Sequence, residues 1–287
     1  MTVTEKLRIC VIDGYPEPYR KELTEAGLAQ AHELYTDFLK SYVPNAIIDV
    51  LFVADLHVSL PAGANLESYD AYMWTGSKLT IYHDDPRVTR QIELSRAIYE
   101  AGRPQCGTCW GVQMAAVAAG GEVKKNPKGR EWSIARDIQL TEEGKKSAMY
   151  TGKPHRFDGF IMHLDEVTRI PEGGTLMATN AHTHVQALEV KHGKGTFWAW
   201  QYHPEYHLYA MARLLVARKE PLTQEGFFKA TSEVEKLVEK MTELSQHPES
   251  VELQKEINIG PDVLDPKIRQ QEFRNWIDYQ VLPSLAR

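Results

Sequence analysis

The chain has 287 residues, of which 43% are hydrophobic and 25% charged, so it is long enough to bury a full core. Its net charge of −6, from 33 basic and 39 acidic residues, argues against a nucleic-acid partner held through phosphates and favours a small-molecule ligand. Three cysteines are too few for a disulfide framework and suit a reducing compartment. The apolar run 9–12 is too short for a signal-peptide core or a membrane span, so we expect a cytoplasmic protein without membrane contact.

The first part of the chain alternates between apolar runs and stretches with helical spacing. This alternation predicts an α/β fold with a mostly parallel central sheet and helices on both faces. The expected strands are 7–13, 46–53, 69–74 and a strand that starts at Pro104, and the expected helices are 19–42 and 87–101. After Gly121 the pattern changes to shorter strands, separated by glycine, proline and polar turns, at 134–140, 175–178, 185–190 and 196–201.

The last part of the chain differs in character, and we predict an α/β domain over 1–218 and a helical extension over 219–287. Apolar residues at helical spacing predict an amphipathic helix over 223–246. Asp265 and Pro266 then have the pattern of an N-cap and first position of a second helix. We favour packing of these helices on the α/β domain; the alternative is a subunit interface in a homo-oligomer.

The segment 107–111 reads Gly-Thr-Cys-Trp-Gly and stands between the strand that starts at Pro104 and an alanine-rich helical stretch. Gly-x-Cys-x-Gly is the cysteine counterpart of the nucleophile elbow, a sharp strand-to-helix turn that exposes one side chain. We therefore expect the flanking glycines to permit the turn and Cys109 to be the nucleophile. A thiolate at this point would also be stabilised by the positive end of the following helix.

A nucleophilic cysteine needs a base that is close to it in space rather than in sequence. The aromatic run 197–202 predicts a buried strand, which is followed by His203 and, two residues later, by Glu205. His203 can take the thiol proton, and Glu205 can orient the imidazole and stabilise the imidazolium. The sequence thus predicts a triad in the order Cys109, His203, Glu205.

Two other interpretations of Cys109 stay open. Cys106 and Cys109 also form a Cys-x-x-Cys pair, which after a strand is typical of a thioredoxin-like redox site. We favour Cys106 as a small apolar residue of its strand, because a redox pair needs neither Gly111 nor a distant histidine. Alternatively, Cys109 and His203 are ordinary core residues.

Together, the motifs resemble those of the class I glutamine amidotransferase family. The residues that carry the resemblance are Pro-x-x-Gly-x-Cys-x-Gly-x-Gln at 104–113 and Gln-Tyr-His-Pro-Glu at 201–205. Segment 74–82 is similar to the family's Thr-Gly-Ser oxyanion loop, and 162–165, Met-His-Leu-Asp, is similar to its His-x-Asp segment. The resemblance covers residues 6–218 and implies flavodoxin-like layering around a Cys-His-Glu triad.

Carried over residue by residue, the resemblance implies an oxyanion hole formed by the backbone N–H groups of Gly76 and Trp110. It also implies substrate-binding roles for Gln113, Ser77, His163 and Asp165. It implies no metal and no other cofactor.

The triad and the resemblance predict cysteine-dependent hydrolysis of the γ-glutamyl amide bond of glutamine or a γ-glutamyl amine, through a glutamyl thioester. Since no second catalytic domain is recognisable after 218, we favour a free-standing hydrolase that releases an amine larger than ammonia. Trp74, Trp110 and Tyr82 are candidates for an apolar pocket that holds this amine. The alternatives are a glutaminase subunit that delivers ammonia to a separate synthase subunit, and a catalytically silent scaffold of the same fold.

Overall fold

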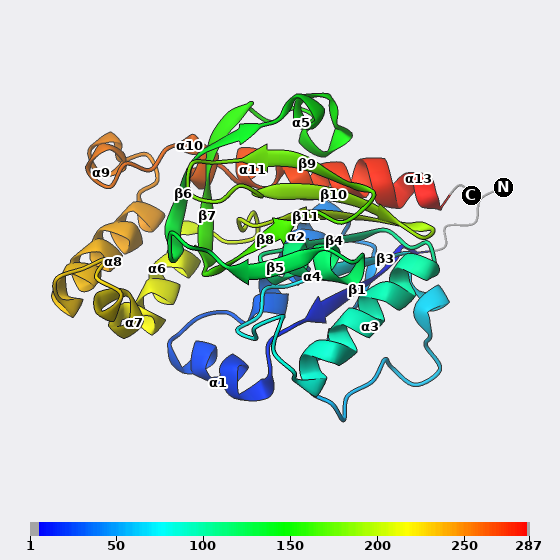
Figure 1. The fold of residues 1–287 in the computed structure, drawn as a ribbon. Coiled ribbons are helices and arrows are strands. Elements are labelled where there is room, and N and C mark those ends of the chain that lie inside the picture. Colours follow the sequence, from blue (N-terminus) through cyan, green and yellow to red (C-terminus); the bar gives the residue numbers. More distant parts are fainter. Residues whose placement is uncertain (1–5, 286–287) are drawn as a thin grey trace.

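A nine-stranded mixed sheet forms the centre of the computed structural model, which describes residues 6–285 (Figure 1). The strand order is β2-β1-β3-β4-β11-β10-β9-β6-β7. The strands are β1 (Arg8–Asp13), β2 (Ile47–Phe52), β3 (Ala71–Trp74), β4 (Gln105–Thr108), β6 (Glu131–Leu140), β7 (Arg156–His163), β9 (Gly174–Thr179), β10 (Ala187–His192) and β11 (Gly195–Trp200). A separate two-stranded sheet pairs β5 (Glu122–Lys125) with β8 (Asp165–Arg169).

The strands from β2 to β11 run parallel, and those from β10 to β7 continue the sheet in antiparallel pairs. The parallel part has the order of flavodoxin-like sheets, in which ligands bind beyond the carboxyl ends of the strands. The expected α/β class with a largely parallel core is confirmed. At this edge the chain leaves β1 at Gly14, β3 at Thr75, β4 at Cys109 and β11 at Gln201.

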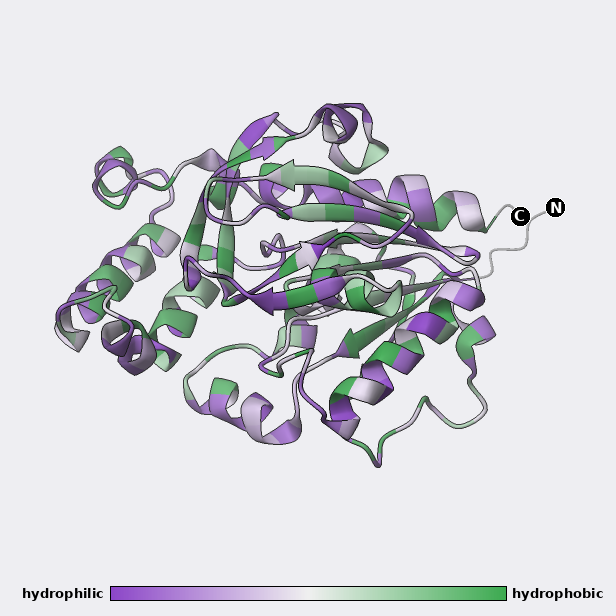
Figure 2. Ribbon diagram, viewed as in Figure 1, coloured by the Kyte–Doolittle hydropathy of each residue, from purple (hydrophilic) through white to green (hydrophobic). Residues whose placement is uncertain are grey.

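Helices cover both faces of the sheet, as expected. The aromatic residues of α2 (Ala31–Tyr42) pack on one face, and α3 (Pro86–Glu100) and α4 (Trp110–Ala118) cover the other. Each face has its own buried cluster of apolar side chains. Figure 2 shows hydrophobic residues along the central strands and alternating polar and hydrophobic residues on the outer helices.

The C-terminal extension packs against the α/β part in two places. The amphipathic helix α8 (Thr231–Gln246) lies along α6 (Leu208–Ala217), with Val234 and Met241 in the same buried cluster as Met211. Further on, α12 (Gln271–Trp276) places Phe273 and Trp276 in the core beneath the sheet. The extension therefore contributes to the core, which is the packing we favoured, and a domain boundary after residue 218 stays a prediction.

The remaining elements are α7 (Lys219–Gln224), α9 (Val251–Glu256), α10 (Pro261–Leu264), α11 (Pro266–Arg269), the π-helix η3 (Ile277–Val281), α13 (Leu282–Ser284), α5 (Glu142–Lys146), η1 (Leu66–Ser68) and η2 (Ala148–Tyr150).

Two predicted helices are interrupted, and both interruptions follow from glycine. The helix expected over 19–42 is divided into α1 (Glu17–Glu25) and α2, because Gly27 has a left-handed φ of 74°. The helix expected over 223–246 begins only at Thr231, since Gly226 has a φ of 83° and Phe227 and Phe228 instead pack on Trp132. The sequence does not predict β5, β7 and β8, because β5 and β8 are short and rich in charged residues and Asp158 and Gly159 interrupt the apolar residues of β7. Among residues 6–285, no helix is long and apolar enough to cross a membrane.

Candidate active site

Cys109 stands at the turn between β4 and α4 in a strained backbone conformation, with φ 53° and ψ −94°. Its N–H donates to the carbonyl of Trp200 on β11 at 2.7 Å, which holds the turn against the neighbouring strand. The flanking glycines do not carry the unusual φ. Gly107 is instead needed for close packing, because a Cβ there would lie 2.7 Å from Trp74 Cβ, whereas at Gly111 the same distance would be 3.6 Å.

His203 and Glu205 follow β11 and are almost fully buried beside Cys109. His203 Nδ1 lies 2.6 Å from Glu205 Oε1, which leaves Nε2 for the thiol. The Tyr206 ring stacks on the imidazole, with centroids 4.3 Å apart. Burial lowers the pKa of His203, but the Glu205 charge and hydrogen bonds to Cys109 and Glu205 outweigh it and raise this pKa to about 10. The imidazole is therefore protonated at neutral pH.

Two residues that the sequence analysis did not identify, Thr108 and Tyr35, form a chain of hydrogen bonds that ends at Glu205. Thr108 Oγ1 donates to Glu205 Oε1 at 3.0 Å, and Thr108 Oγ1 lies 2.5 Å from the hydroxyl of Tyr35 on α2. Thr108 and Tyr35 are both fully buried. The sequence marks Thr108 only as the residue before the nucleophile, and Tyr35 only as a core aromatic residue.

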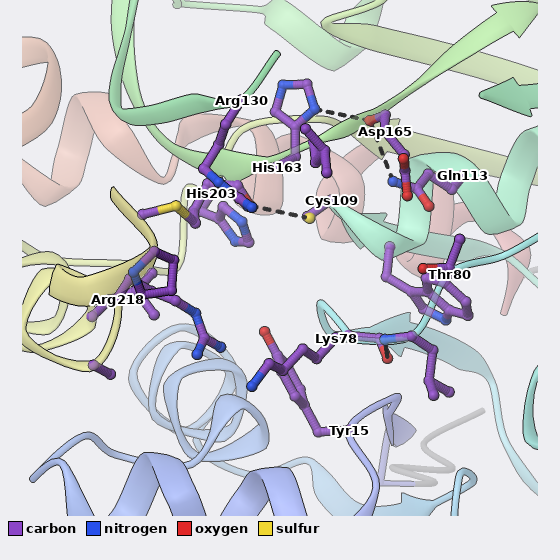
Figure 3. A pocket seen from close by; sticks show the side chains of 18 of the residues that line it. Tyr15, Lys78, Thr80, Cys109, Gln113, Arg130, His163, Asp165, His203 and Arg218 are labelled. Carbon is purple, nitrogen blue, oxygen red and sulfur yellow. Dashed lines mark hydrogen bonds between the residues drawn. The ribbon is translucent and has the colours of Figure 1, made fainter. Parts of the chain in front are cut away.

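Cys109 opens into a cavity of about 480 Å³, within the range of small-molecule sites. Figure 3 shows Cys109 among the labelled side chains, with His203 on one side, Gln113 on the other, and Lys78 and Arg218 facing the same hollow. The walls come from the β1, β3 and β4 edge, from β7 and β8, and from α6. The lining residues are Tyr15, Glu22, Ser77, Lys78, Leu79, Thr80, Cys109, Trp110, Gln113, Arg130, Met162, His163, Leu164, Asp165, His203, Tyr206, Leu214, Ala217, Arg218 and Pro221.

The residues expected to form the oxyanion hole lie beside the triad. A Cβ built on Gly76 would be 3.6 Å from His203 Cε1, which places Gly76 next to the imidazole. Trp110 directly follows Cys109 and begins α4. Ser77 lines the cavity, and its hydroxyl donates to the Gly14 carbonyl at 2.7 Å, which fixes the loop after β3.

Gln113, His163 and Asp165 also meet at the cavity. Gln113 Nε2 lies 3.5 Å from the Asp165 carbonyl, and its buried Oε1 has no hydrogen-bond partner within the described part of the chain. His163 ends β7 and Asp165 begins β8, so the His-x-Asp segment joins two strands rather than lying in a loop. Both ring nitrogens of His163 are engaged, Nδ1 with the Asp165 carbonyl at 2.8 Å and Nε2 with Glu131 at 3.1 Å.

The aromatic residues expected around an apolar pocket do not form one. Trp74 is fully buried, with its indole N–H donating to Gln105, and it does not line the cavity. Tyr82 is half exposed and outside the cavity, while its hydroxyl donates to Asp165 at 3.0 Å. Of the three, only Trp110 lines the wall. The cavity is instead lined by charged side chains, chiefly those of Lys78, Arg130 and Arg218. Their positions in the sequence do not predict that they lie close together.

The chain is similar in sequence and in fold to known proteins. A family model described as glutamine amidotransferase class-I matches residues 82–219. The chain is 33% identical to a γ-glutamyl-L-1-hydroxyisopropylamide hydrolase of a Pseudomonas species, over 99% of this chain and 96% of the relative. It is 34% identical to the GMP synthase of Lactococcus lactis subsp. cremoris (strain SK11) over 39% of this chain, but only 21% of that protein.

The fold is also similar to that of a glutamine amidotransferase from Thermotoga maritima. The TM-score is 0.69 at 19% identity, and the match covers 96% of this chain and 99% of the other. With a whole-length relative in sequence and a family model over the elbow and triad segments, the chain belongs to the class-I glutamine amidotransferase family.

Proposed function

We propose that this protein is a free-standing hydrolase that cleaves a γ-glutamyl amide into glutamate and an amine, with Cys109 as nucleophile. The observation that carries the proposal is the strained Cys109 in a cavity that His203 also lines, with Nδ1 of His203 held by the buried carboxylate of Glu205. The whole-length similarity to a γ-glutamyl amide hydrolase, which includes the helical extension, supports the proposal.

The first half of the reaction forms a thioester. The Cys109 thiolate attacks the δ-carbonyl carbon of the γ-glutamyl group and forms a C–S bond, and the carbonyl oxygen becomes an oxyanion. The N–H groups of Gly76 and Trp110 receive this oxyanion, and losing one such donor typically costs about 2.7–4 kcal/mol of transition-state stabilisation. The C–N bond then breaks, and protonated His203 gives its proton to the departing nitrogen.

The second half releases glutamate. Neutral His203 takes a proton from water, which attacks the thioester carbonyl. The C–S bond breaks, the acid product leaves, and the proton remains on His203 beside the regenerated thiolate. Glu205 stays ionised throughout and keeps Nδ1 of the imidazole in place. Gln113, with its unpartnered Oε1, is our candidate to bind the glutamyl half.

The second candidate function is a glutaminase subunit that delivers ammonia to a separate synthase. The match to 21% of a GMP synthase favours it, because that protein is named as glutamine-hydrolysing. The match covers only 39% of this chain. We therefore place the free-standing hydrolase first.

The test is to offer the purified chain γ-glutamyl alkylamides and glutamine without any other protein. We expect release of the amine from the alkylamides and a glutamyl adduct on Cys109 by intact-protein mass spectrometry. Cys109→Ser should fold, bind and lose turnover. Turnover of glutamine alone, appearing only when a synthase is added, would favour the second candidate, and a Cys109→Ala variant with unchanged activity would exclude the thioester route.

A further inference from the structure

The His203 side of the cavity is where the amine half of the substrate must lie, if the proposed function holds. His203 gives its proton to the departing nitrogen, so the substituent on that nitrogen extends past the imidazole and away from the glutamyl half. Tyr206 stacks on the imidazole, and the Tyr15 hydroxyl lies on the same side, because a Cβ on Gly76 would be 3.4 Å from it. These rings form the near part of the wall.

The far part of this wall is a cluster of three charged side chains, Glu22, Lys78 and Arg218 (Figure 3 labels the two cations). Glu22 Oε2 lies 2.8 Å from Lys78 Nζ, and Glu22 Oε1 lies 2.8 Å from Arg218 Nη1. The single carboxylate of Glu22 thus pairs with two cations, and the cluster has a surplus of one positive charge. Arg218 is only 15% exposed, and within residues 6–285 its guanidinium donates from Nη1 alone.

The surplus positive charge of the cavity lies in the cluster of Glu22, Lys78 and Arg218 and not in the other walls. Arg130 forms a bidentate ion pair with Glu225, in which Nε lies 2.7 Å from Oε2 and Nη2 lies 2.8 Å from Oε1. The charge of Arg130 is therefore neutralised. Asp165 lies on the Gln113 side, where a carboxylate suits the ammonium of the glutamyl half. Arg218 also acts on the reacting end of the wall: burial and Cys109 raise the pKa of Tyr15, and Arg218 opposes that rise.

We infer that the leaving amine carries a carboxylate, so that γ-glutamyl conjugates of amino acids are the preferred substrate class. This inference rests on the proposed function and specifies the substrate of the same site. A guanidinium whose Nε–Nη2 edge makes no other hydrogen bond within residues 6–285 and lies in a partly desolvated wall forms a paired, charge-assisted interaction with a carboxylate. Lys78 completes the contact as a second cation. A neutral amine leaves the surplus charge uncompensated.

Three substrates with amines of similar length test the inference: γ-glutamyl-β-alanine, γ-glutamyl-3-aminopropanol and γ-glutamyl-propylamide. They end in a carboxylate, a hydroxyl and a methyl group. We expect kcat/KM to fall in that order, with carboxylate exceeding methyl by about 10- to 100-fold, the contribution of one hydrogen bond between charged groups. The ratio is measured within one protein preparation, so the fraction of folded enzyme cancels.

Variants with opposite effects on the charge sharpen the test. Arg218→Met removes the surplus and should bring the carboxylate-to-methyl ratio close to one, whereas Glu22→Gln increases the surplus and should raise the ratio above that of the wild type. Lys219→Met is the matched control, because Lys219 pairs with Glu235 and does not line the cavity. It should leave the ratio unchanged.

The outcomes separate the inference from the proposed function. Equal hydrolysis of all three substrates, or an undiminished carboxylate preference in Arg218→Met, overturns the carboxylate subsite and leaves the hydrolase intact. Failure to cleave any of the three, with glutamine cleaved only alongside a synthase, overturns the hydrolase and the subsite together.

Discussion

Glu205→Gln is the substitution that tests the electrostatics of the triad most directly. The change keeps the size of the side chain but removes the Glu205 charge, which together with Cys109 raises the pKa of His203 from 6.5 to about 10, a total of about 5 kcal/mol. Removing one adjacent carboxylate typically accounts for about 1–3 pH units of such a shift. The amide also donates to Nδ1 and favours the wrong imidazole tautomer, so we expect kcat to fall on the order of 10⁴-fold.

The sign of the pH effect follows from the proton that His203 holds. A raised pKa keeps the imidazole protonated up to about pH 10, so activity of the wild type should fall on the alkaline side near that pH. In Glu205→Gln the proton is lost earlier, so the alkaline limb of kcat/KM should move to lower pH. Glu205→Asp retains the charge and serves as the control. An alkaline limb at the same pH in Glu205→Gln and wild type would refute the reasoning.

Three further substitutions test the surroundings of the site. Thr108→Val removes the hydroxyl that donates to the triad carboxylate and should lower kcat about 10- to 100-fold, while Thr108→Ser retains it; equal rates in both variants would show that this hydrogen bond does not position the triad. Gly107→Ala places a Cβ 2.7 Å from the neighbouring strand and should destabilise the fold by about 1–3 kcal/mol in urea unfolding, whereas Gly111→Ala makes an ordinary 3.6 Å contact and should not. Lys153→Met strips Glu272 of its buried partner at 2.8 Å and should cost about 3–5 kcal/mol, with the added change Glu272→Leu recovering part of that loss; a double variant no more stable than the single one would contradict this account.

The sequence by itself determined the class of the fold and the identity of the nucleophile segment. Strands such as β1 are continuous apolar runs, because both faces of a parallel sheet are covered, and this pattern is visible without coordinates. The elbow at 107–111 and the histidine after β11 are local motifs, so their residue types and spacing were enough to predict that Cys109, His203 and Glu205 work together. The roles of these residues stay proposals that the experiments above test.

Tertiary structure alone decided what surrounds that segment. Lys78, Arg130 and Arg218 come from three distant parts of the chain, and single charged residues on loops and helix ends carry no pattern that predicts convergence. Thr108 at the end of β4 and Tyr35 on α2 are 73 residues apart in the sequence and meet only in the folded chain. The local sequence specifies the residues of the triad that we propose, whereas the shape and charge of the cavity, from which we infer the amine, depend on long-range packing.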